Sequence, residues 1–253
     1  MSRLTEDQAD RYSRQLMLDV VDTTGQEALL DASVLVVGAG GLGSPVIQYL
    51  AAAGIGHLGI ADRGVVKRSN LQRQIIHSEA TIGQPKVASA AEFVQQLNSD
   101  VHVDTIQEPV QANNVESLLS PYDVVVDGLD GFEARYLLNE AAQEQHMPFV
   151  HGAVHGFVGQ MIVFTPGGPC YRCLYPEQPT WVPSDEPIGI FPVVPGAIGC
   201  MEATETLKGL LEIGELRDDR LLRFEALESA WFESPVKPDP ACPVCGDPST
   251  RPD

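Results

Sequence analysis

The stretch "VLVVGAGGLGSP", residues 34–45, passes from apolar β-forming residues into a series of glycines. The apolar run predicts a buried strand, and Pro45 suits the first turn of a following helix. Gly38, Gly40 and Gly43 fit the spacing G-x-G-x-x-G, in which a strand turns into a helix whose N-terminal N–H groups face a phosphate. The loop predicts a nucleotide-binding α/β unit, but it does not by itself identify the nucleotide.

The sequence on both sides of this loop alternates between strand and helix patterns. The predicted elements are strands at 34–38, 57–62, 101–106, 122–128 and 148–154, and helices at 5–18, 25–31, from 44, 85–98 and 132–146. This alternation favours an α/β fold with a Rossmann-like, doubly wound and mostly parallel sheet. Further strands at 156–166 and 219–227, with a helix at 197–212 between them, are expected to be antiparallel.

The composition suits one globular domain. The chain has 253 residues, of which 43% are hydrophobic and 20% charged. No apolar run approaches the ~18 residues that a membrane span needs. The N-terminal residues are polar and contain no apolar signal core, so we expect a cytoplasmic protein without a membrane partner.

The charge balance is strongly acidic. With 35 acidic and 16 basic residues, the formal net charge is −19. Contact with a nucleic-acid backbone needs a basic face, so no nucleic-acid partner is expected. A site for a polyanion must then be a local cluster of cations, and basic residues near the glycine loop become candidates for it.

Acidic residues follow two predicted strands at the edge of the sheet where ligands bind. Asp62 ends the second strand, where a carboxylate can accept hydrogen bonds from ribose hydroxyls. Asp127 and Asp130 follow the fourth strand. The carboxyl ends of parallel strands share one edge, so all three are expected close to the glycine loop.

The stretch RSNLQRQI, residues 68–75, argues against a nicotinamide cofactor. A nicotinamide enzyme has no need for two arginines and an asparagine directly after the ribose carboxylate. Guanidinium groups such as that of Arg73 bind phosphate oxygens bidentately, and Lys86 at a helix start adds another cation. These residues favour ATP and leave an NAD-dependent oxidoreductase as the weaker alternative.

The cysteines predict a second site. Cys170-Tyr-Arg-Cys173 and Cys242-Pro-Val-Cys245 are two Cys-x-x-Cys pairs, together the four thiolates of a tetrahedral structural zinc site. Two disulfides are the alternative, which a cytosolic location disfavours. The fifth cysteine, Cys200 in AIGCMEA, is predicted to pack at the start of an apolar helix.

The chain resembles the MoeB/ThiF/HesA family of ubiquitin-activating-enzyme-like adenylyltransferases. The resemblance extends over essentially the whole chain, in the family's order. The segments that carry it are RYSRQ (11–15), GAGGLGSP (38–45), YLAAAGIG (49–56), SNLQRQ (69–74), G-x-x-K (83–86), D-G-x-x-x-R-Y (130–136), G-x-x-G-Q (156–160) and the two cysteine pairs.

This resemblance implies ATP-dependent adenylation of the C-terminal glycine of a small ubiquitin-like sulfur-carrier protein, MoaD- or ThiS-like, with release of pyrophosphate. The carrier would end in Gly-Gly and serve cofactor biosynthesis, tRNA thiolation or protein conjugation. The resemblance also leads us to expect a separate sulfur donor. It divides the single domain 1–253 into an N-terminal helical segment (1–32), a nucleotide-binding part (33–155) and a carrier-binding and zinc part (156–253).

The resemblance also implies the residue roles. Arg73, Lys86 and Asn70 would contact phosphates, Asp62 the ribose, and Asp130 a magnesium ion. Arg14 would reach the phosphates from a partner subunit, which implies a homodimer. The catalytic residues expected in this way are Arg73, Lys86, Asp130 and Arg14, and the nucleotide-binding ones are Gly38, Gly40, Gly41, Gly43, Asp62, Asn70, Arg73, Lys86 and Asp130.

The chain departs from the family at three positions. Asp185 stands where thioester-forming relatives have a cysteine, so an enzyme thioester is not expected. Gly64 and Gly131 stand where relatives often have an acidic residue and an asparagine. These departures leave a non-catalytic homologue, which binds nucleotide and carrier without turnover, as an alternative. His151 and His155 are interpreted as packing residues without a catalytic role.

Overall fold

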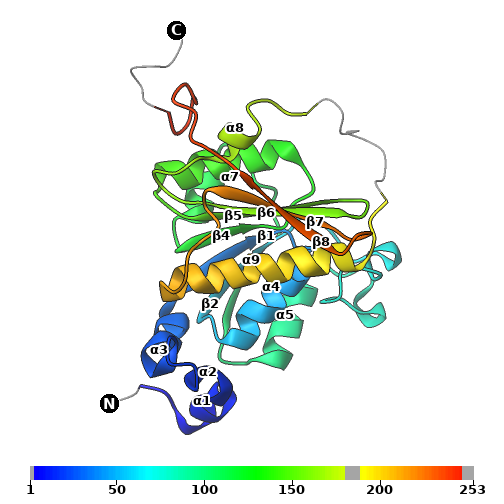
Figure 1. Cartoon of the computed structure of the whole chain (residues 1–253). Helices are drawn as coiled ribbons and strands as arrows, with labels where there is room; N and C mark the ends of the chain where they lie inside the picture. The colour runs from blue at the N-terminus through cyan, green and yellow to red at the C-terminus, as the bar shows by residue number, and fades with distance from the viewer. Residues whose placement is uncertain (1–2, 180–188, 247–253) are drawn as a thin grey trace.

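A mixed sheet of eight strands runs through the protein (Figure 1). The structure is a computed structural model of the chain and describes residues 3–179 and 189–246. The strands are β1 (Ser33–Val37), β2 (His57–Ala61), β3 (His102–Ile106), β4 (Val124–Asp127), β5 (Phe149–His155), β6 (Val158–Phe164), β7 (Arg220–Glu225) and β8 (Ala230–Pro235).

The strand order is β3-β2-β1-β4-β5-β6-β7-β8. The first five strands in this order pair in parallel, whereas β6, β7 and β8 continue the sheet antiparallel. The chain leaves β1 toward β2 on one side and later returns to β4 on the other. This reversal is the switch point at which open α/β sheets bind ligands, and it confirms the predicted doubly wound fold.

Helices cover both faces of the sheet. They are α1 (Glu6–Arg11), α2 (Ser13–Leu16), α3 (Asp22–Asp31), α4 (Gly43–Ala53), α5 (Lys86–Leu97), α6 (Val115–Leu119), α7 (Phe132–Glu144), α8 (Tyr171–Leu174) and α9 (Val193–Leu211). Figure 1 places α4, α5 and α9 below the sheet and α7 and α8 above it. Among the described helices, none combines the length and the apolar character that a membrane crossing requires.

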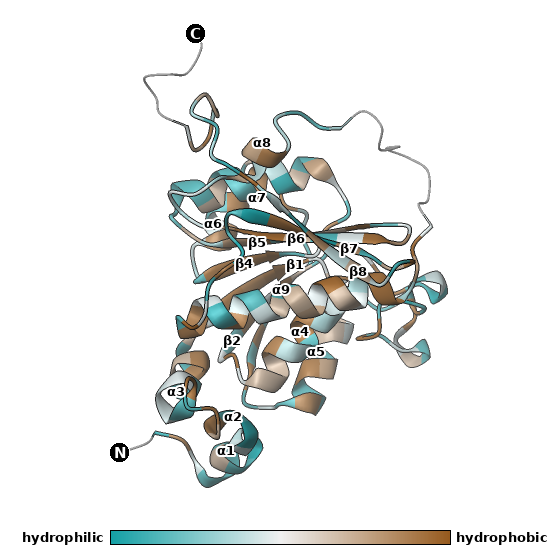
Figure 2. Ribbon diagram, in the orientation of Figure 1, coloured by the Kyte–Doolittle hydropathy of each residue, from teal (hydrophilic) through white to brown (hydrophobic). Residues whose placement is uncertain are grey.

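The core has one layer on each face of the sheet. The larger layer joins α4, α5 and α9 to residues such as Val34, Val36 and Ile60, and the other joins α7 to Leu35 and Val125. Alternate residues of one strand thus enter different layers. Because both faces are covered, the central strands are continuous apolar runs, which Figure 2 shows as brown ribbons between the helical layers.

Two predicted helices have different boundaries in the structure. The helix expected at 5–18 is interrupted at Tyr12, which ends α1 and precedes α2. The buried Tyr12 hydroxyl accepts a hydrogen bond from Asn98 Nδ2 at 2.9 Å, so tertiary packing fixes the break. The helix expected at 197–212 begins earlier, at Val193. Pro195 lies in its first turn, where the missing N–H has no helical partner to lose.

Besides the 3-10 helices Arg68–Asn70 and Glu79–Thr81, three short elements were not expected from the sequence. They are α6, α8 and the strand β8. The two helices have five and four residues, which is too short for a recognisable helical period. β8 pairs only with β7 at the edge of the sheet, and most of its residues are exposed, so it lacks the apolar signal of a buried strand.

Candidate active site

The glycine loop makes close backbone contact with the loop that follows β4. Gly38 has φ +107°, and a Cβ on it would lie 2.4 Å from the carbonyl oxygen of Gly128. A Cβ on Gly43 would lie 1.8 Å from the carbonyl oxygen of Gly38. Only glycine fits at both positions, because a side chain on Gly38 would separate the two loops and one on Gly43 would collide with the backbone of the glycine loop itself. The loops after β1 and β4 therefore meet at the switch point, as the spacing predicted.

Three side chains hold the glycine loop in place. Asp62 Oδ2 accepts the backbone N–H of Ala39 at 2.9 Å, and His77 Nε2 donates to the Ala39 carbonyl at 2.9 Å. Burial lowers the pKa of His77, so the imidazole is neutral in this position. Ser44 Oγ donates to the Gly40 carbonyl at 2.6 Å. Asp62 thus supports the loop, and its contact with a ribose is still a prediction.

Gly64 affects the position of the Asp62 carboxylate. The Gly64 N–H donates to Asp62 Oδ1 at 2.7 Å, and a Cβ on Gly64 would lie 3.0 Å from the same oxygen. Lys86, the first residue of α5 as predicted, places Nζ 3.5 Å from Asp62 Oδ2. Both side chains of this pair are mostly buried, at 15% and 13% exposure. A side chain at residue 64 would crowd this pair.

Arg73 and Asn70 lie on the connection between β2 and α5. A Cβ placed on Gly41 would be 3.5 Å from Arg73 Cδ, so the arginine lies against the glycine loop. Asn70 ends the short 3-10 helix Arg68–Asn70 and accepts the Lys67 N–H on its Oδ1 at 3.2 Å. Both residues are partly exposed. The structure thus brings Arg73 and Lys86 to the same loop system as Asp62.

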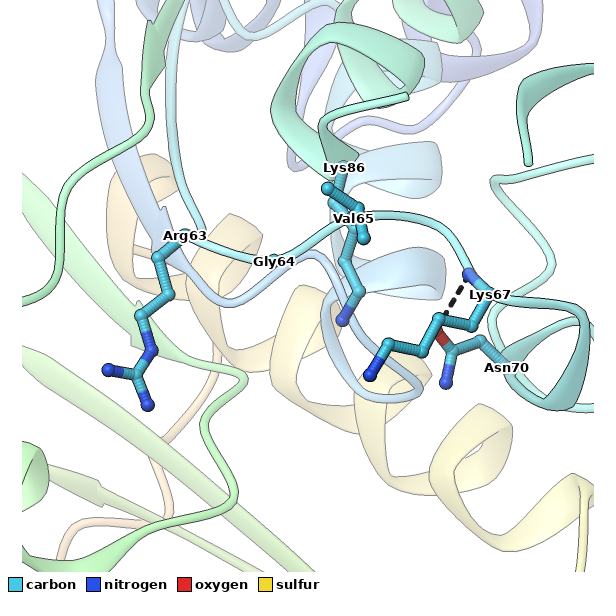
Figure 3. Close-up of a pocket in the computed structure, with 6 residues that line it drawn as sticks. All are labelled: Arg63, Gly64, Val65, Lys67, Asn70 and Lys86. Atoms are coloured by element: carbon cyan, nitrogen blue, oxygen red, sulfur yellow. Dashed lines mark hydrogen bonds between the residues drawn. The ribbon is translucent and has the colours of Figure 1, made fainter. Parts of the chain in front are cut away.

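A pocket of about 340 Å³ opens beside this loop system (Figure 3). Figure 3 shows Arg63 on one side of it, and Lys67, Asn70 and Lys86 grouped on the other. Arg63 and Lys67 were not among the residues expected from the sequence. Their signal was the concentration of basic residues in the segment 63–73 of an acidic chain.

The ion pairs of the protein set the cations of this site apart. Most basic side chains in the described part of the chain contact a carboxylate: Arg3, Arg68, Lys86, Arg135, Arg172, Lys208, Arg217, Arg220 and Arg223. Within residues 3–179 and 189–246, no ion pair is formed by Arg63, Lys67 or Arg73. Arg11, Arg14 and Lys237 also form no ion pair with the described residues. Arg63, Lys67 and Arg73 differ from them because they lie together beside the glycine loop, which makes them candidates for binding an anion.

Asp127 and Asp130 have different environments. Asp127 is fully buried, and its Oδ2 accepts from Arg135 Nε at 2.8 Å and His151 Nδ1 at 2.6 Å. Burial would raise its pKa, but the Arg135 charge and the hydrogen bonds lower the pKa below the ordinary value. Asp130 is exposed in the loop after β4. Asp127 therefore lies in the protein interior, whereas the exposed Asp130 can contact a ligand.

His151 packs in the protein interior, as interpreted from the sequence. Burial lowers its pKa, and its neutral ring donates to Asp127. His155, the last residue of β5, is exposed, so its interpretation as a packing residue is wrong. Neither imidazole contacts the glycine loop.

Arg14 lies far from the glycine loop of its own chain. It is exposed on α2, next to the C-terminal end of α4, where Gln15 Nε2 donates to the Ala53 carbonyl at 3.1 Å. The glycine loop is at the other end of α4, and a helix of 11 residues is about 16 Å long. One chain alone does not bring Arg14 to the nucleotide loop, so its expected role needs a second copy.

Four cysteines form the second cluster. The Sγ atoms of Cys170, Cys173, Cys242 and Cys245 lie within 4.8 Å of one another, with Cys170–Cys242 at 3.6 Å and Cys173–Cys245 at 3.3 Å. All four are free thiols, which contradicts the disulfide alternative. A tetrahedron with Zn–S distances of about 2.3 Å has edges of about 3.8 Å. The cluster fits a zinc ion, which would tie the segment after β8 to α8.

Cys200 lies apart from that cluster. It is in the interior of α9 rather than at the helix start, since α9 begins at Val193. The thiol is half-buried, and burial raises its pKa. Asp185, the position of the thioester cysteine in relatives, lies outside the described residues.

Comparison with known sequences shows which proteins the chain is similar to. The chain matches the ThiF family over residues 12–244. It is 48% identical to the SAMP-activating enzyme E1 of Haloferax volcanii, covering 95% of this chain and 90% of that protein. It is 44% identical to the sulfur carrier protein adenylyltransferase of Thermus thermophilus, covering 98% and 95%. The adenylyltransferase and sulfurtransferase MOCS3 of Arabidopsis thaliana is 45% identical, but this chain spans 54% of it.

Solved structures show the same fold. The crystal structure of E. coli MccB with succinimide superposes with a TM-score of 0.83 at 21% identity, covering 97% of this chain and 75% of that one. MccB with ATP gives 0.80 at 22% identity, covering 94% and 74%. At these identities the likeness concerns the fold alone. The match to the family model over residues 12–244 establishes that the chain belongs to the ThiF family.

Proposed function

We propose that this protein adenylates the C-terminal glycine of a small ubiquitin-like sulfur carrier, using ATP and releasing pyrophosphate. The observation that carries the proposal is the group of cations around the glycine loop, Arg63, Lys67 and Arg73, which form no ion pair with a carboxylate of the described residues. The names of the Haloferax and Thermus relatives, which this chain matches over nearly their whole length, agree with this chemistry.

The reaction begins when a carboxylate oxygen of the carrier attacks the α-phosphorus of ATP. The new P–O bond forms as the bond to the pyrophosphate oxygen breaks, leaving an acyl adenylate. Negative charge gathers on the phosphate oxygens in the transition state, where Arg73 and Lys86 stabilise it. Asn70 donates to a phosphate oxygen, and Asp62 accepts from the ribose. Lys67, which lines the same pocket as Asn70 and Lys86, holds the pyrophosphate that leaves.

Asp130 is the proposed ligand for a magnesium ion. Its exposed carboxylate follows β4 at the switch point, and carboxylate oxygen is a donor that magnesium prefers. When bound, magnesium neutralises phosphate charge. Arg14 completes the site from the second subunit of a homodimer. We further propose a cytoplasmic enzyme that depends on a separate sulfur donor.

The test is pyrophosphate release from purified protein, Mg-ATP and a ubiquitin-fold carrier ending in Gly-Gly. Release is expected with the intact carrier and absent with a carrier that lacks its last glycine. A protein that binds ATP without carrier-dependent release would instead be a non-catalytic homologue. In a calorimetric titration, ATP should bind and NAD should not; tighter binding of NAD would overturn the nucleotide assignment.

A further inference from the structure

Two histidines and an aspartate converge at the amino ends of β2 and β3. His57 and His102 are the first residues of these strands and pair directly in the parallel register, and Asp104 lies two residues along β3. Asp104 Oδ2 is 2.8 Å from His57 Nε2, and Asp104 Oδ1 is 3.3 Å from His102 Nε2. The glycine loop is at the opposite, carboxyl end of these strands.

The backbone fixes these three side chains in relation to one another. The His57 N–H donates to the Ala32 carbonyl at 3.1 Å, and the His102 N–H donates to the Gly56 carbonyl at 2.9 Å. Successive residues alternate between sheet faces, so residues 102 and 104 share the face of His57. Two rigid neighbouring strands therefore present all three groups from one surface.

The donor atoms have the spacing of a metal site. All three ligand atoms lie within 4.8 Å of one another. A tetrahedral ion about 2.1 Å from imidazole nitrogen and carboxylate oxygen needs donors about 3.4 Å apart. The Asp104 Oδ1–His102 Nε2 distance of 3.3 Å matches this spacing, and the 2.8 Å hydrogen bond between Asp104 Oδ2 and His57 Nε2 must lengthen when the ion binds. The Tyr122 hydroxyl donates to Asp104 Oδ2 at 3.3 Å, a support of the kind that orients metal ligands. His102 is 71% exposed, which leaves solvent access for a fourth ligand.

We propose that His57, His102 and Asp104 bind a divalent transition-metal ion such as Zn²⁺, Ni²⁺ or Co²⁺. Two imidazoles and one carboxylate suit these ions, whereas Mg²⁺ and Ca²⁺ prefer oxygen donors alone. The net charge of −19 favours the approach of a cation. The bound ion bridges β2 to the edge strand β3. This site is distinct from the four cysteines and independent of the proposed adenylation.

The experiment is a calorimetric titration of Ni²⁺ into the full-length protein, purified without a histidine tag and with its cysteine site loaded with zinc. One saturable Ni²⁺ site per chain is expected. The variant His102→Ala should weaken this site at least about tenfold, since even supporting residues around a ligand contribute that much. Asp104→Asn should weaken it as well, and Ni²⁺ should raise the thermal midpoint of the native protein but not of His102→Ala.

The control is His155→Ala, which removes another exposed histidine at the end of β5. Its Ni²⁺ binding should equal that of the native protein. His102→Ala changes an exposed side chain, and circular dichroism verifies that the variant is folded. The proposal is overturned if the native protein has no saturable Ni²⁺ site, or if His102→Ala and Asp104→Asn bind as tightly as His155→Ala. A Co²⁺ spectrum dominated by thiolate charge transfer would also overturn it, since the ion would then be on cysteines.

Discussion

Arg135 donates from Nε to Asp127 Oδ2 at 2.8 Å, and both side chains are almost completely buried, at 5% and 0% exposure. Arg135 also donates from Nη2 to the carbonyls of Leu129 and Gly152. One guanidinium thus connects α7, β4, β5 and the loop that carries Asp130. Since two charges have been removed from water here, each depends on the other for compensation.

Replacing Arg135 by Ala should lower the free energy of unfolding by about 3–5 kcal/mol, because it leaves the Asp127 charge buried without its partner. Urea denaturation measures this. The matched control is Arg172→Ala, whose pair with Glu140 is partly exposed and should cost about 0–1 kcal/mol. Equal losses in the two variants would contradict the importance of the buried pair.

Glu202 on α9 predicts a dependence of stability on pH. Its carboxylate is buried, neither oxygen has a hydrogen-bond partner in the described structure, and burial raises its pKa well above the ordinary value. The folded protein therefore keeps this proton, while the unfolded chain releases it above pH ~4.5. The stability that this group contributes is present below that pH and is lost as the pH rises toward the folded pKa.

A glutamine at position 202 cannot ionise, so the variant Glu202→Gln does not lose this stability as the pH rises. Its free energy of unfolding, relative to the native protein, should increase by up to about 1.4 kcal/mol for each pH unit above ~4.5. Urea denaturation at pH 5.5 and 7.5 measures the change. A difference between variant and native protein that is the same at both pH values would show that Glu202 is ionised in the folded state.

The parallel part of the fold follows from local signals. The run at 34–45 and the alternating strands and helices predict the order of elements, because a sheet buried on both faces needs apolar strands. The edge strand β8 lacks that signal. The predicted start of α9 is too late because a proline such as Pro195 is typical of a loop. A proline in the first turn of a helix costs no hydrogen bond, so α9 begins before it, at Val193.

The sequence predicts the candidate site less completely than it predicts the fold. Asp127 at the end of β4 and Asp130 just after it look equivalent in the sequence. Asp127 is buried in an ion pair with Arg135, a contact that only the fold reveals. Arg63 and Lys67 belong to a basic segment that the sequence shows, but only the structure shows that they form no ion pair with the described carboxylates. For Arg14 the resemblance suggests a role that the structure of a single chain does not explain.

Replacing Arg73 by Ala should lower the rate of adenylation more than the affinity for ATP, since a contact that strengthens as charge builds on the α-phosphate acts mainly on the rate. The loss should be ~3 kcal/mol, on the order of a hundredfold. Carrier-dependent ATP–pyrophosphate exchange measures it. The neighbouring Arg68, which pairs with Glu79 on the surface, is the control, and Arg68→Ala should retain full activity. An unchanged rate in Arg73→Ala would remove this residue from the mechanism.

The purified protein should contain about one zinc ion per chain. Zinc at the four cysteines ties the C-terminal segment to α8, so Cys173→Ser should lose the metal and on the order of 4 kcal/mol of stability. Cys200→Ser is the matched control, because this thiol is outside the cluster and should leave the zinc content unchanged. Metal analysis and thermal unfolding measure both effects. A native protein without zinc, with all four thiols freely alkylated, would refute the site.

The enzyme should activate its carrier without forming a thioester to itself. A thioester needs an accessible thiolate near the acyl adenylate. Four of the five cysteines belong to the cluster at α8, and the fifth, Cys200, is half-buried within α9 with a pKa raised by burial.

The resemblance leads us to expect Asp185 at the position of the thioester cysteine of relatives, and a carboxylate cannot act as a sulfur nucleophile. The acyl adenylate should therefore persist until a separate sulfur donor attacks it. After incubation of enzyme, carrier and Mg-ATP, a non-reducing gel should show no enzyme–carrier adduct. The same result is expected for Cys200→Ala. An adduct that disappears with added thiol and is missing in Cys200→Ala would identify Cys200 as the acceptor and refute the prediction.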